Sequence, residues 1–374
     1  MTADASSTTA LDAAHTFRAQ ILAERERIEA ERRLPDSLAG ALARAGFFRI
    51  ALPSAYGGLD LTPTEELAVY DELARADAST AWTVWNANTN WTTVRLPTAT
   101  AKAIFSRPEA MFANSTQPKG RAVIVDGGYR VSGQWSLVSG CQLSEGMQLT
   151  CVVYEDGAPR LTSAGAPETR LVFCSTTDCE VVDMWASGGL RGTGSHDVVV
   201  HDLFVPAGRA SWHSDPLVVP GLGTIALGIA HGAIEALIDL AKEKVPERSG
   251  QTLSADQGAQ ARLAEAEALV RSARLYLFDA VDRLWQTVLT TGECPVDLRT
   301  QVLLANYHAV TCAVRAVDLV YLTGGATSLY TSCLLERAFR DVHAVTQHAG
   351  VHPKTLERTG RVLFGLEAND AHLL

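Results

Sequence analysis

The sequence predicts an α+β protein built in three successive parts: an N-terminal α-helical domain at residues 1–110, a middle antiparallel β-barrel or β-sandwich domain at 111–210, and a C-terminal four-helix bundle domain at 211–374. Three observations lead to this prediction. Helix-start signals fill the first third of the chain. Short β-rich segments separated by turn formers fill the middle. Long segments with apolar residues spaced three and four apart fill the last part.

Composition and charge limit the class of protein. The 374 residues are 47% hydrophobic and 20% charged, as in globular proteins. The net charge of -10, without a basic stripe, argues against nucleic-acid binding, and no polybasic membrane anchor is present. The seven cysteines are scattered and contain no CxxC pair, which indicates neither a disulfide framework nor a metal site. The N-terminus lacks the apolar core of a secretion signal, so we expect a cytoplasmic protein.

In the N-terminal part, residues 1–15 are small and polar, and we expect them to be frayed. The strongest helix start is Thr62-Pro63, because Pro suits the first turn and the following acidic residues favour the positive end of the helix dipole. Helices are predicted at residues 16–33, 35–45, 63–75 and 79–96.

The middle part contains six short segments rich in β-branched and aromatic residues. Turn formers such as Asp126-Gly127-Gly128 separate them. The segments lie at residues 122–125, 129–132, 148–154, 170–174, 179–182 and 196–201. Their close spacing predicts a small antiparallel barrel or sandwich.

The C-terminal part is predicted to form helices at residues 222–245, 254–291, 295–322 and 327–349. Its most membrane-like run, 217–241, carries His231, Glu235 and Asp239 four residues apart. These side chains form a polar stripe along one face, so we expect a half-buried helix of a soluble bundle and no membrane span.

One run near the C-terminus, residues 336–350, combines two arginines, two carboxylates and two histidines before a glycine. We predict that Arg337, Arg340 and Asp341 form a structural ion-pair network. The two histidines, His343 and His348, lie among small apolar residues and are candidates for the wall of an active site.

Several short motifs occur in the order found in one known family. They are Leu34-Pro35 with Ala45-Gly46-Phe47, the run 53–58, Asp77 to Trp82, Gly133 to Gly140, Gly192 to Ser195 leading to Phe204-Val205-Pro206, and Glu336-Arg337 with Arg340-Asp341. With the α–β–α order, they make the chain resemble the acyl-CoA dehydrogenase fold, and within it the two-component (group D) flavin-dependent monooxygenases. The resemblance extends from Leu34 to Gly365.

The resemblance implies a reaction, a cofactor and partners. Reduced flavin, either FAD or FMN, would react with O2 to give a C4a-hydroperoxide that oxygenates a small aromatic or other electron-rich molecule, in a catabolic or natural-product pathway. A separate reductase would supply the reduced flavin, and subunits that share the flavin site would form a homotetramer.

The same resemblance places the catalytic residues. Nine residues after Arg340, where the dehydrogenases keep their catalytic glutamate, this chain has Ala349, which cannot accept a proton. His348 precedes it and would activate the substrate, with His343 as a second candidate. Ser139, six residues after Gly133, would contact the flavin near N5. Asn88, or Asn90 as the alternative, lies where hydroxylase relatives often carry a histidine.

The cofactor-binding residues implied by the resemblance belong to five segments. They are Ser115, Thr116, Ser139, Trp185, Thr193, Ser195, Arg248, Gln260, Gly324 and Gly325. A plain reading stands beside this one for each segment. Residues 114–118 and 192–195 also fit ordinary turns, Arg248 fits a solvated linker, and His348 fits a helix end stabilised by the dipole.

Two other functions remain open on the sequence. A thioester oxidoreductase of the acyl-CoA dehydrogenase type would need a displaced base, with Glu336 or an acid of the 231–243 helix as candidates. A catalytically inactive scaffold could bind flavin or a partner protein without turnover.

Overall fold

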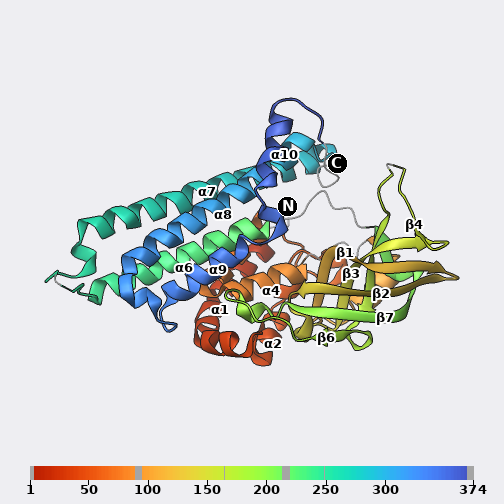
Figure 1. Ribbon diagram of the computed structural model, residues 1–374, viewed down its shortest axis with the longest axis horizontal. Helices are drawn as coiled ribbons and strands as arrows, with labels where there is room; N and C mark the ends of the chain where they lie inside the picture. Colours follow the sequence, from red (N-terminus) through yellow and green to blue (C-terminus); the bar gives the residue numbers. More distant parts are fainter. Residues whose placement is uncertain (1–3, 89–94, 164, 213–219, 248, 369–374) are drawn as a thin grey trace.

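The computed structural model describes residues 4–88, 95–163, 165–212, 220–247 and 249–368. A helical N-terminal part, a central sheet and a C-terminal helical bundle follow one another along the chain, as predicted. The N-terminal helices lie between the bundle and the sheet (Figure 1). This arrangement brings helix ends from both helical parts close to one end of the sheet.

The α-helices described in the N-terminal part are α1 (Asp4–Glu31), α2 (Asp36–Arg44), α3 (Pro63–Ala76), α4 (Ala78–Asn88) and α5 (Thr98–Ile104). The expected fraying of residues 1–15 is wrong from Asp4 onward, because Ala10 and Ala14 are buried in the core and make this turn part of α1. Helix α3 begins with the predicted signal. Glu65 accepts the Thr62 amide at 2.7 Å, which completes a capping box.

The described strands form one eight-stranded sheet in the order β6-β7-β2-β1-β3-β5-β8, with β4 paired to β3. The strands are β1 (Phe112–Val125), β2 (Gly128–Val138), β3 (Gly146–Glu155), β4 (Ala158–Pro159), β5 (Thr169–Ser175), β6 (Glu180–Val182), β7 (His196–Pro206) and β8 (Ala210–Trp212). Trp135 is fully buried at its centre and donates its indole N–H to the Thr150 carbonyl at 2.7 Å.

The predicted antiparallel pairing is wrong for one pair, because β1 and β3 run parallel and the sheet is mixed. After the β1–β2 hairpin, the chain crosses the end of the sheet through the short helix η4 (Cys141–Leu143). It then enters β3 in the direction of β1. This crossover places Ser139 and Gly140 at the end of the sheet that faces the helices.

The bundle consists of α6 (Gly221–Glu243), α7 (Gln257–Thr291), α8 (Val296–Gly324) and α9 (Leu334–Val345), followed by α10 (Lys354–Leu363). Asp256 caps α7 by accepting the Ala259 amide at 2.7 Å, and Gly292 ends it in the left-handed conformation. Helix α9 ends at Val345, before the predicted end at 349. His348 therefore lies in an extended conformation and caps the short helix η10 (Ala349–Val351).

Two segments of the bundle are long and apolar enough to cross a membrane by length and composition, Gly221–Glu243 and Val296–Leu329. In the apolar window of α6, 72% of the residues are buried inside the fold, as expected of a core helix. Its polar stripe forms ion pairs within the protein, where Glu235 pairs with Arg18 and Arg75 and His231 lies 3.4 Å from Asp71.

Candidate active site

The centre of the candidate site is Trp82 on α4. Trp82 and Trp85 are three residues apart, so they face the same side of the helix, and their rings meet edge-to-face with centroids 5.3 Å apart. The indole nitrogen of Trp82 donates to Ser139 Oγ at 3.1 Å. The same ring packs against the imidazole of His348 with centroids 5.8 Å apart. The structure thus brings Ser139 and His348, 209 positions apart in the sequence, to two sides of one indole.

Ser139 is held by the end of β2. Gly140 has φ +74°, where any side chain would be strained, and it donates its amide to the Thr193 carbonyl at 2.8 Å. This bond ties the strand end to the helix η6 (Arg191–Thr193). Ser139 Oγ lies 2.7 Å from Ser195 Oγ, which lies 2.7 Å from Thr193 Oγ1. Three predicted flavin-site residues thereby form one row of hydroxyls, each buried.

His348 is held by the turn after α9. Its Nδ1 accepts the Gly350 amide at 3.0 Å, so the neutral ring carries its proton on Nε2. The residue is accessible to solvent, yet surrounding protein atoms desolvate the ring and lower its pKa from the ordinary value. The alternative of a helix-end histidine stabilised by the dipole does not fit, because α9 has already ended and such an interaction would raise the pKa.

The start of α6 and the middle of α8 fix the position of this turn. Asn306 accepts the Gly223 amide at 2.8 Å and donates to the Gly350 carbonyl at 3.4 Å. A Cβ on Gly221 would lie 2.2 Å from the Trp85 ring, so only glycine allows α6 to begin this close to the tryptophans. The ring of Trp85 lies 6.0 Å from that of His348.

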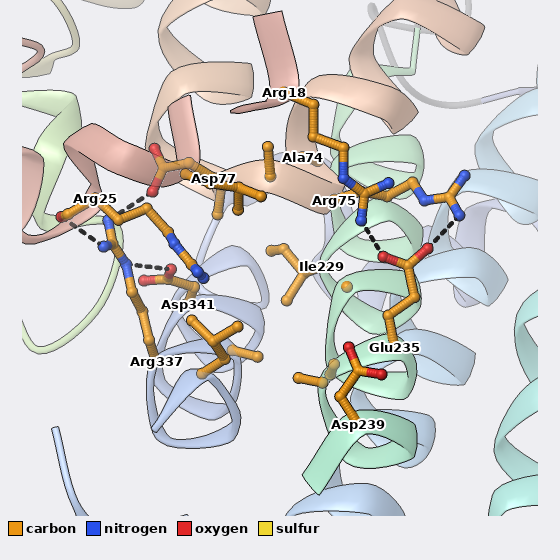
Figure 2. A pocket seen from close by; sticks show the side chains of 18 residues that line it. Arg18, Arg25, Ala74, Arg75, Asp77, Ile229, Glu235, Asp239, Arg337 and Asp341 are labelled. Atoms are coloured by element: carbon orange, nitrogen blue, oxygen red, sulfur yellow. Dashed lines mark hydrogen bonds and ion pairs between the residues drawn. The ribbon is translucent and has the colours of Figure 1, made fainter. Parts of the chain in front are cut away.

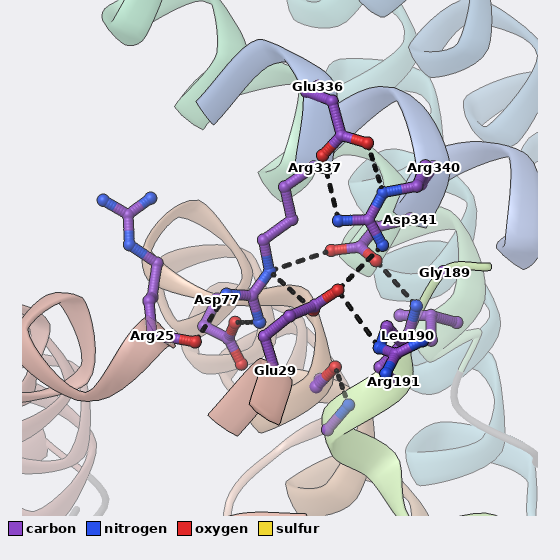
Figure 3. Close-up of polar contacts among 12 residues, drawn as sticks. Arg25, Glu29, Asp77, Gly189, Leu190, Arg191, Glu336, Arg337, Arg340 and Asp341 are labelled. Atoms are coloured by element: carbon purple, nitrogen blue, oxygen red, sulfur yellow. Dashed lines mark hydrogen bonds and ion pairs between the residues drawn. The ribbon is translucent and has the colours of Figure 1, made fainter. Parts of the chain in front are cut away.

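The predicted ion-pair network at the start of α9 is present. We call it the charged cluster and define it as Glu29, Asp77, Glu336, Arg337, Arg340 and Asp341 (Figure 3). Arg337 pairs with Asp77 at 2.6 Å, and Arg340 binds Glu29 at 2.9 Å. Glu336 accepts two bonds from Arg340, at 2.6 and 3.0 Å, which argues against it as a free displaced base.

Leu190 joins the charged cluster to the hydroxyl row. Its amide donates to Asp341 Oδ1 at 2.6 Å, and its carbonyl accepts from Thr193 Oγ1 at 2.9 Å. Leu190 has φ +52°, an uncommon conformation for a residue with a side chain, so these contacts hold a strained peptide in place. Burial raises the pKa of Asp341 to about 6, against the lowering effect of Arg337.

A cavity of about 170 Å³ lies between α1, α3, α6 and α9, where Arg18 and Arg75 reach Glu235 (Figure 2). Arg337 and Asp341 of the charged cluster line another part of its wall. Trp82, Ser139 and His348 are not among the lining residues, so this cavity is separate from the aromatic site.

Two of the predicted catalytic residues lie elsewhere. Asn88 donates to the carbonyls of Phe47 and Val84, at 2.7 and 2.8 Å, and accepts the Ala51 amide. Its amide therefore holds the N-terminal backbone together. His343 is half-exposed and lies 3.0 Å from Asp318 on α8, in a pair near the surface.

The predicted cofactor residues fall into two groups. Ser115 is buried on β1, Thr116 is exposed at the β1 bulge, and Trp185 donates to the carbonyls of Leu190 and Arg191 beside the hydroxyl row. The second group lies at the other end of α6, where Lys244 binds the Gly324 carbonyl and Gln260 binds that of Ser254.

The second group is far from Trp82 within one chain. Helix α6 has 23 residues, so its ends are roughly 33 Å apart at 1.5 Å per residue. Gly324 is packed against Ser328 and Leu335, and Gly325 has φ +56°. Arg248 lies outside the described residues.

The sequence did not indicate Trp82, Trp85 or Leu137 as candidate site residues. Three tryptophans within ten residues, at 82, 85 and 91, were the available signal, although Trp91 lies outside the described residues. Leu137 has φ +61° and is 56% exposed beside Ser139, which makes it an apolar, strained residue at the edge of the site. No feature of the sequence marks that conformation.

The residues around Trp82 suit a flat ring with polar edges. The described contacts of Trp82, Ser139, Thr193, Ser195 and His348 involve hydroxyls, ring nitrogens and backbone groups, and none involves a carboxylate. Thr83 adds a buried hydroxyl without a hydrogen-bond partner in the described part of the chain. Among the described residues, no cluster of His, Cys, Asp or Glu could hold a metal ion.

Comparison with known proteins shows which chains this one resembles. Residues 6–105 match the family model of the acyl-CoA dehydrogenase N-terminal domain, and residues 221–353 match that of the acyl-CoA dehydrogenase C-terminal domain. The oxygenase subunit HsaA of a flavin-dependent monooxygenase from Rhodococcus jostii is 30% identical, over 91% of this chain and 94% of that protein.

Two further similarities cover nearly the whole chain. Indole-3-acetate monooxygenase from Pseudomonas putida is 28% identical, over 92% of this chain and 90% of that protein. The crystal structure of the HsaA monooxygenase from M. tuberculosis superposes with a TM-score of 0.88 at 27% identity, covering 98% of this chain and 99% of that one.

Proposed function

The chain belongs to the acyl-CoA dehydrogenase family, in its branch of flavin-dependent monooxygenases, and from that premise we propose that Trp82, Ser139 and His348 form its reaction site and that its substrate is aromatic. The observation that carries this proposal is the contact of one indole with both other residues, at 3.1 Å to Ser139 Oγ and at 5.8 Å between rings to His348. Each of the three comes from a different part of the fold.

The cofactor is a flavin in its reduced form, which supplies the activated oxygen after reaction with O2. In our proposal, Ser139 and the exposed Thr116 contact the ring edges and Leu137 covers part of its face. The buried position of the hydroxyl row and of Trp82 supports this, because such a site excludes water from a reactive group.

His348 acts in our proposal as a neutral hydrogen-bond donor. Nδ1 is engaged by the Gly350 amide, and the lowered pKa keeps the ring uncharged at neutral pH. Nε2–H then donates to an oxygen of the substrate and favours its ionised form, in which the aromatic ring is richer in electrons. This differs from the proton-accepting role that the sequence suggested, because the nitrogen that could accept a proton is already engaged.

An electron-rich aromatic substrate fits the walls of the site. Trp82 and Trp85 present aromatic edges and faces, which prefer stacked or edge-on ring partners. The relative from Pseudomonas putida is named for indole-3-acetate, an aromatic acid. We propose a substrate of this class that carries a hydroxyl or another acceptor for His348.

We further propose that the enzyme works as a homotetramer whose flavin site is shared between subunits. The residues near Gly324 lie roughly 33 Å from the Trp82 site in one chain, so a single flavin could meet both groups only across a subunit boundary. Leu322, Leu329 and Tyr330 support this, since each is about 70% exposed around that end of α8. Native mass spectrometry with and without flavin tests the assembly, and a monomer that binds flavin at full affinity would contradict it.

A cytoplasmic location is part of the same proposal. The described part of the chain contains no disulfide, and even Cys174 and Cys179, with sulfurs 3.6 Å apart, are not bonded, as suits a reducing compartment. A separate reductase that uses NAD(P)H to reduce flavin would act there as well.

The proposal is tested by reconstitution with a flavin reductase, NAD(P)H and a panel of phenols and indoles, with products read by mass. We expect the purified protein to be nearly colourless and to yield hydroxylated product only when the reductase is present. Protein that instead purifies with tightly bound flavin and bleaches with an acyl-CoA thioester would overturn the proposal.

A further inference from the structure

The hydroxyl row at the active site has a fixed direction. It runs from the Trp82 indole N–H through Ser139, Ser195 and Thr193 to the Leu190 carbonyl, with steps of 3.1, 2.7, 2.7 and 2.9 Å. An indole N–H can only donate and a carbonyl can only accept. Both ends of the row therefore impose the same polarity.

The number of protons in the row fixes which group donates in each hydrogen bond between these ends. Each hydroxyl has one proton. Thr193 gives its proton to Leu190, so it must accept from Ser195. Ser195 has then used its proton and must accept from Ser139.

Ser139 thus gives its own proton to Ser195 while one of its lone pairs accepts from Trp82. The hydrogen-bonding capacity that Ser139 still has for a ligand is the second lone pair of its hydroxyl oxygen. Toward the flavin site, Ser139 is an acceptor and not a donor.

The surroundings keep the row from reversing. Ser139, Thr193 and Ser195 are 3%, 1% and 5% exposed, so water cannot readily take over one of the bonds. Leu190, which accepts the last proton, is fixed through its amide by Asp341, and Asp341 lies 3.7 Å from Arg337. The charged cluster thereby anchors the end of the row.

We propose that this one-way hydroxyl row makes the site select reduced over oxidised flavin. The inference rests on the proposed function, in which Ser139 contacts the central ring of the flavin. Reduced flavin carries an N–H at N5, which a hydroxyl lone pair can accept, whereas oxidised N5 offers only a lone pair that repels it. One hydrogen bond made in one redox state and opposed in the other gives a preference of roughly tenfold or more.

The test is the ratio of dissociation constants for oxidised and reduced flavin, measured by tryptophan fluorescence, with the reduced form studied anaerobically. Thr193→Val removes the acceptor of Ser195, so Ser195 can turn and donate to Ser139, and the Ser139 proton is released toward the ligand. We expect the ratio to fall roughly tenfold, equivalent to a shift of about 30 mV in the potential of bound flavin.

Two matched variants serve as controls. Thr193→Ser retains the hydroxyl and should keep the wild-type ratio. Ser144→Ala removes a hydroxyl that binds the Gly140 carbonyl at 2.9 Å in the same strand end but outside the row, and it should also keep that ratio. Ser195→Ala breaks the row at another point and should lower the ratio as Thr193→Val does.

The outcomes separate the two claims. If the wild-type protein bound neither form of flavin, the proposed function would fail and this inference with it. If it bound flavin but folded Thr193→Val and Ser195→Ala kept the wild-type ratio, the directed row would be wrong while the proposed function stood.

Discussion

The two ends of segment 336–350 differ in charge and in the role that we assign to each. Its start belongs to the charged cluster, where carboxylates and guanidiniums pair with one another and join α1, Asp77 at the end of α3, and α9. Its end, His348, belongs to an uncharged site of indoles and hydroxyls. The concentration of charge in the sequence therefore marks the part that holds the helices together. We propose that the chemistry lies at the other end, where charge is absent and one imidazole remains accessible.

The largest expected effect is on product formation and comes from substitutions of His348. His348→Ala should lower product formation about 100-fold or more, since loss of one donor at a developing charge costs 10² to 10³ in rate. His348→Gln, which keeps an N–H donor, should retain clearly more activity than His348→Ala. Product yields with reduced flavin measure both, and thermal melts should be nearly unchanged because the residue is accessible.

Equal loss of activity in the two His348 variants would contradict the donor role and favour a proton acceptor. Full activity in His348→Ala would remove this residue from the chemistry altogether. Either result would weaken the contrast between the two ends of the segment.

The next effect is on stability, at the charged end. Arg337→Met strands Asp77, whose side chain is fully buried, and should lower the free energy of unfolding by about 3–5 kcal/mol. Arg271→Met is the matched control, because its pair with Glu267 is largely exposed and contributes less than about 1 kcal/mol. Urea denaturation measures both, and similar losses would show that the charged cluster is no more structural than a surface pair.

A smaller effect concerns the pH dependence of activity. Desolvation lowers the pKa of His348, so the neutral imidazole persists below pH 6.5. We expect the acid limb of kcat/KM to lie below that pH and to disappear in His348→Gln. Stability should depend on pH in the same direction as activity. The unfolded chain binds the His348 proton more readily than the folded protein does. The contribution of His348 to the free energy of unfolding is therefore present above pH 6.5 and declines as the pH falls toward the folded pKa. An acid limb above pH 6.5 would contradict the desolvated neutral ring.

The smallest expected effect is on the pH dependence of stability and comes from Asp341 in the charged cluster. Its sign is opposite to that of His348. Burial raises the pKa of Asp341 to about 6 from 3.8, so the folded state binds its proton more readily. Its contribution to stability is greatest below pH 3.8 and declines as the pH rises toward 6. Comparing unfolding free energies of the wild type and Asp341→Asn over this range isolates the term. Parallel curves would show that Asp341 has an ordinary pKa.

The α–β–α order and the capping box at Thr62 could be predicted because they depend on local residue patterns. The parallel pairing of β1 and β3 could not, since it arises from where the chain crosses the sheet. The end of α9 at Val345 could not be predicted either, because no proline or glycine marks it before Gly350.

The sequence indicated two residues of the proposed site but not the residue at its centre. Ser139 and His348 were indicated by the resemblance, yet the residue that joins them, Trp82, looked like one apolar residue of a helix. Asn88 looked polar enough for catalysis, but tertiary contacts direct its amide to the backbone. The division of the flavin residues between the two ends of α6 follows from helix length and packing, which the motif order does not contain.

The most direct test of the central claim is a single turnover under ¹⁸O2. Protein mixed anaerobically with reduced flavin and a hydroxylated aromatic substrate would be exposed to the labelled gas, and the product analysed by mass spectrometry. We predict one ¹⁸O atom in each product molecule with the wild type, and almost no labelled product with His348→Ala despite bound flavin. Product without label, or the same labelled yield from His348→Ala, would contradict it.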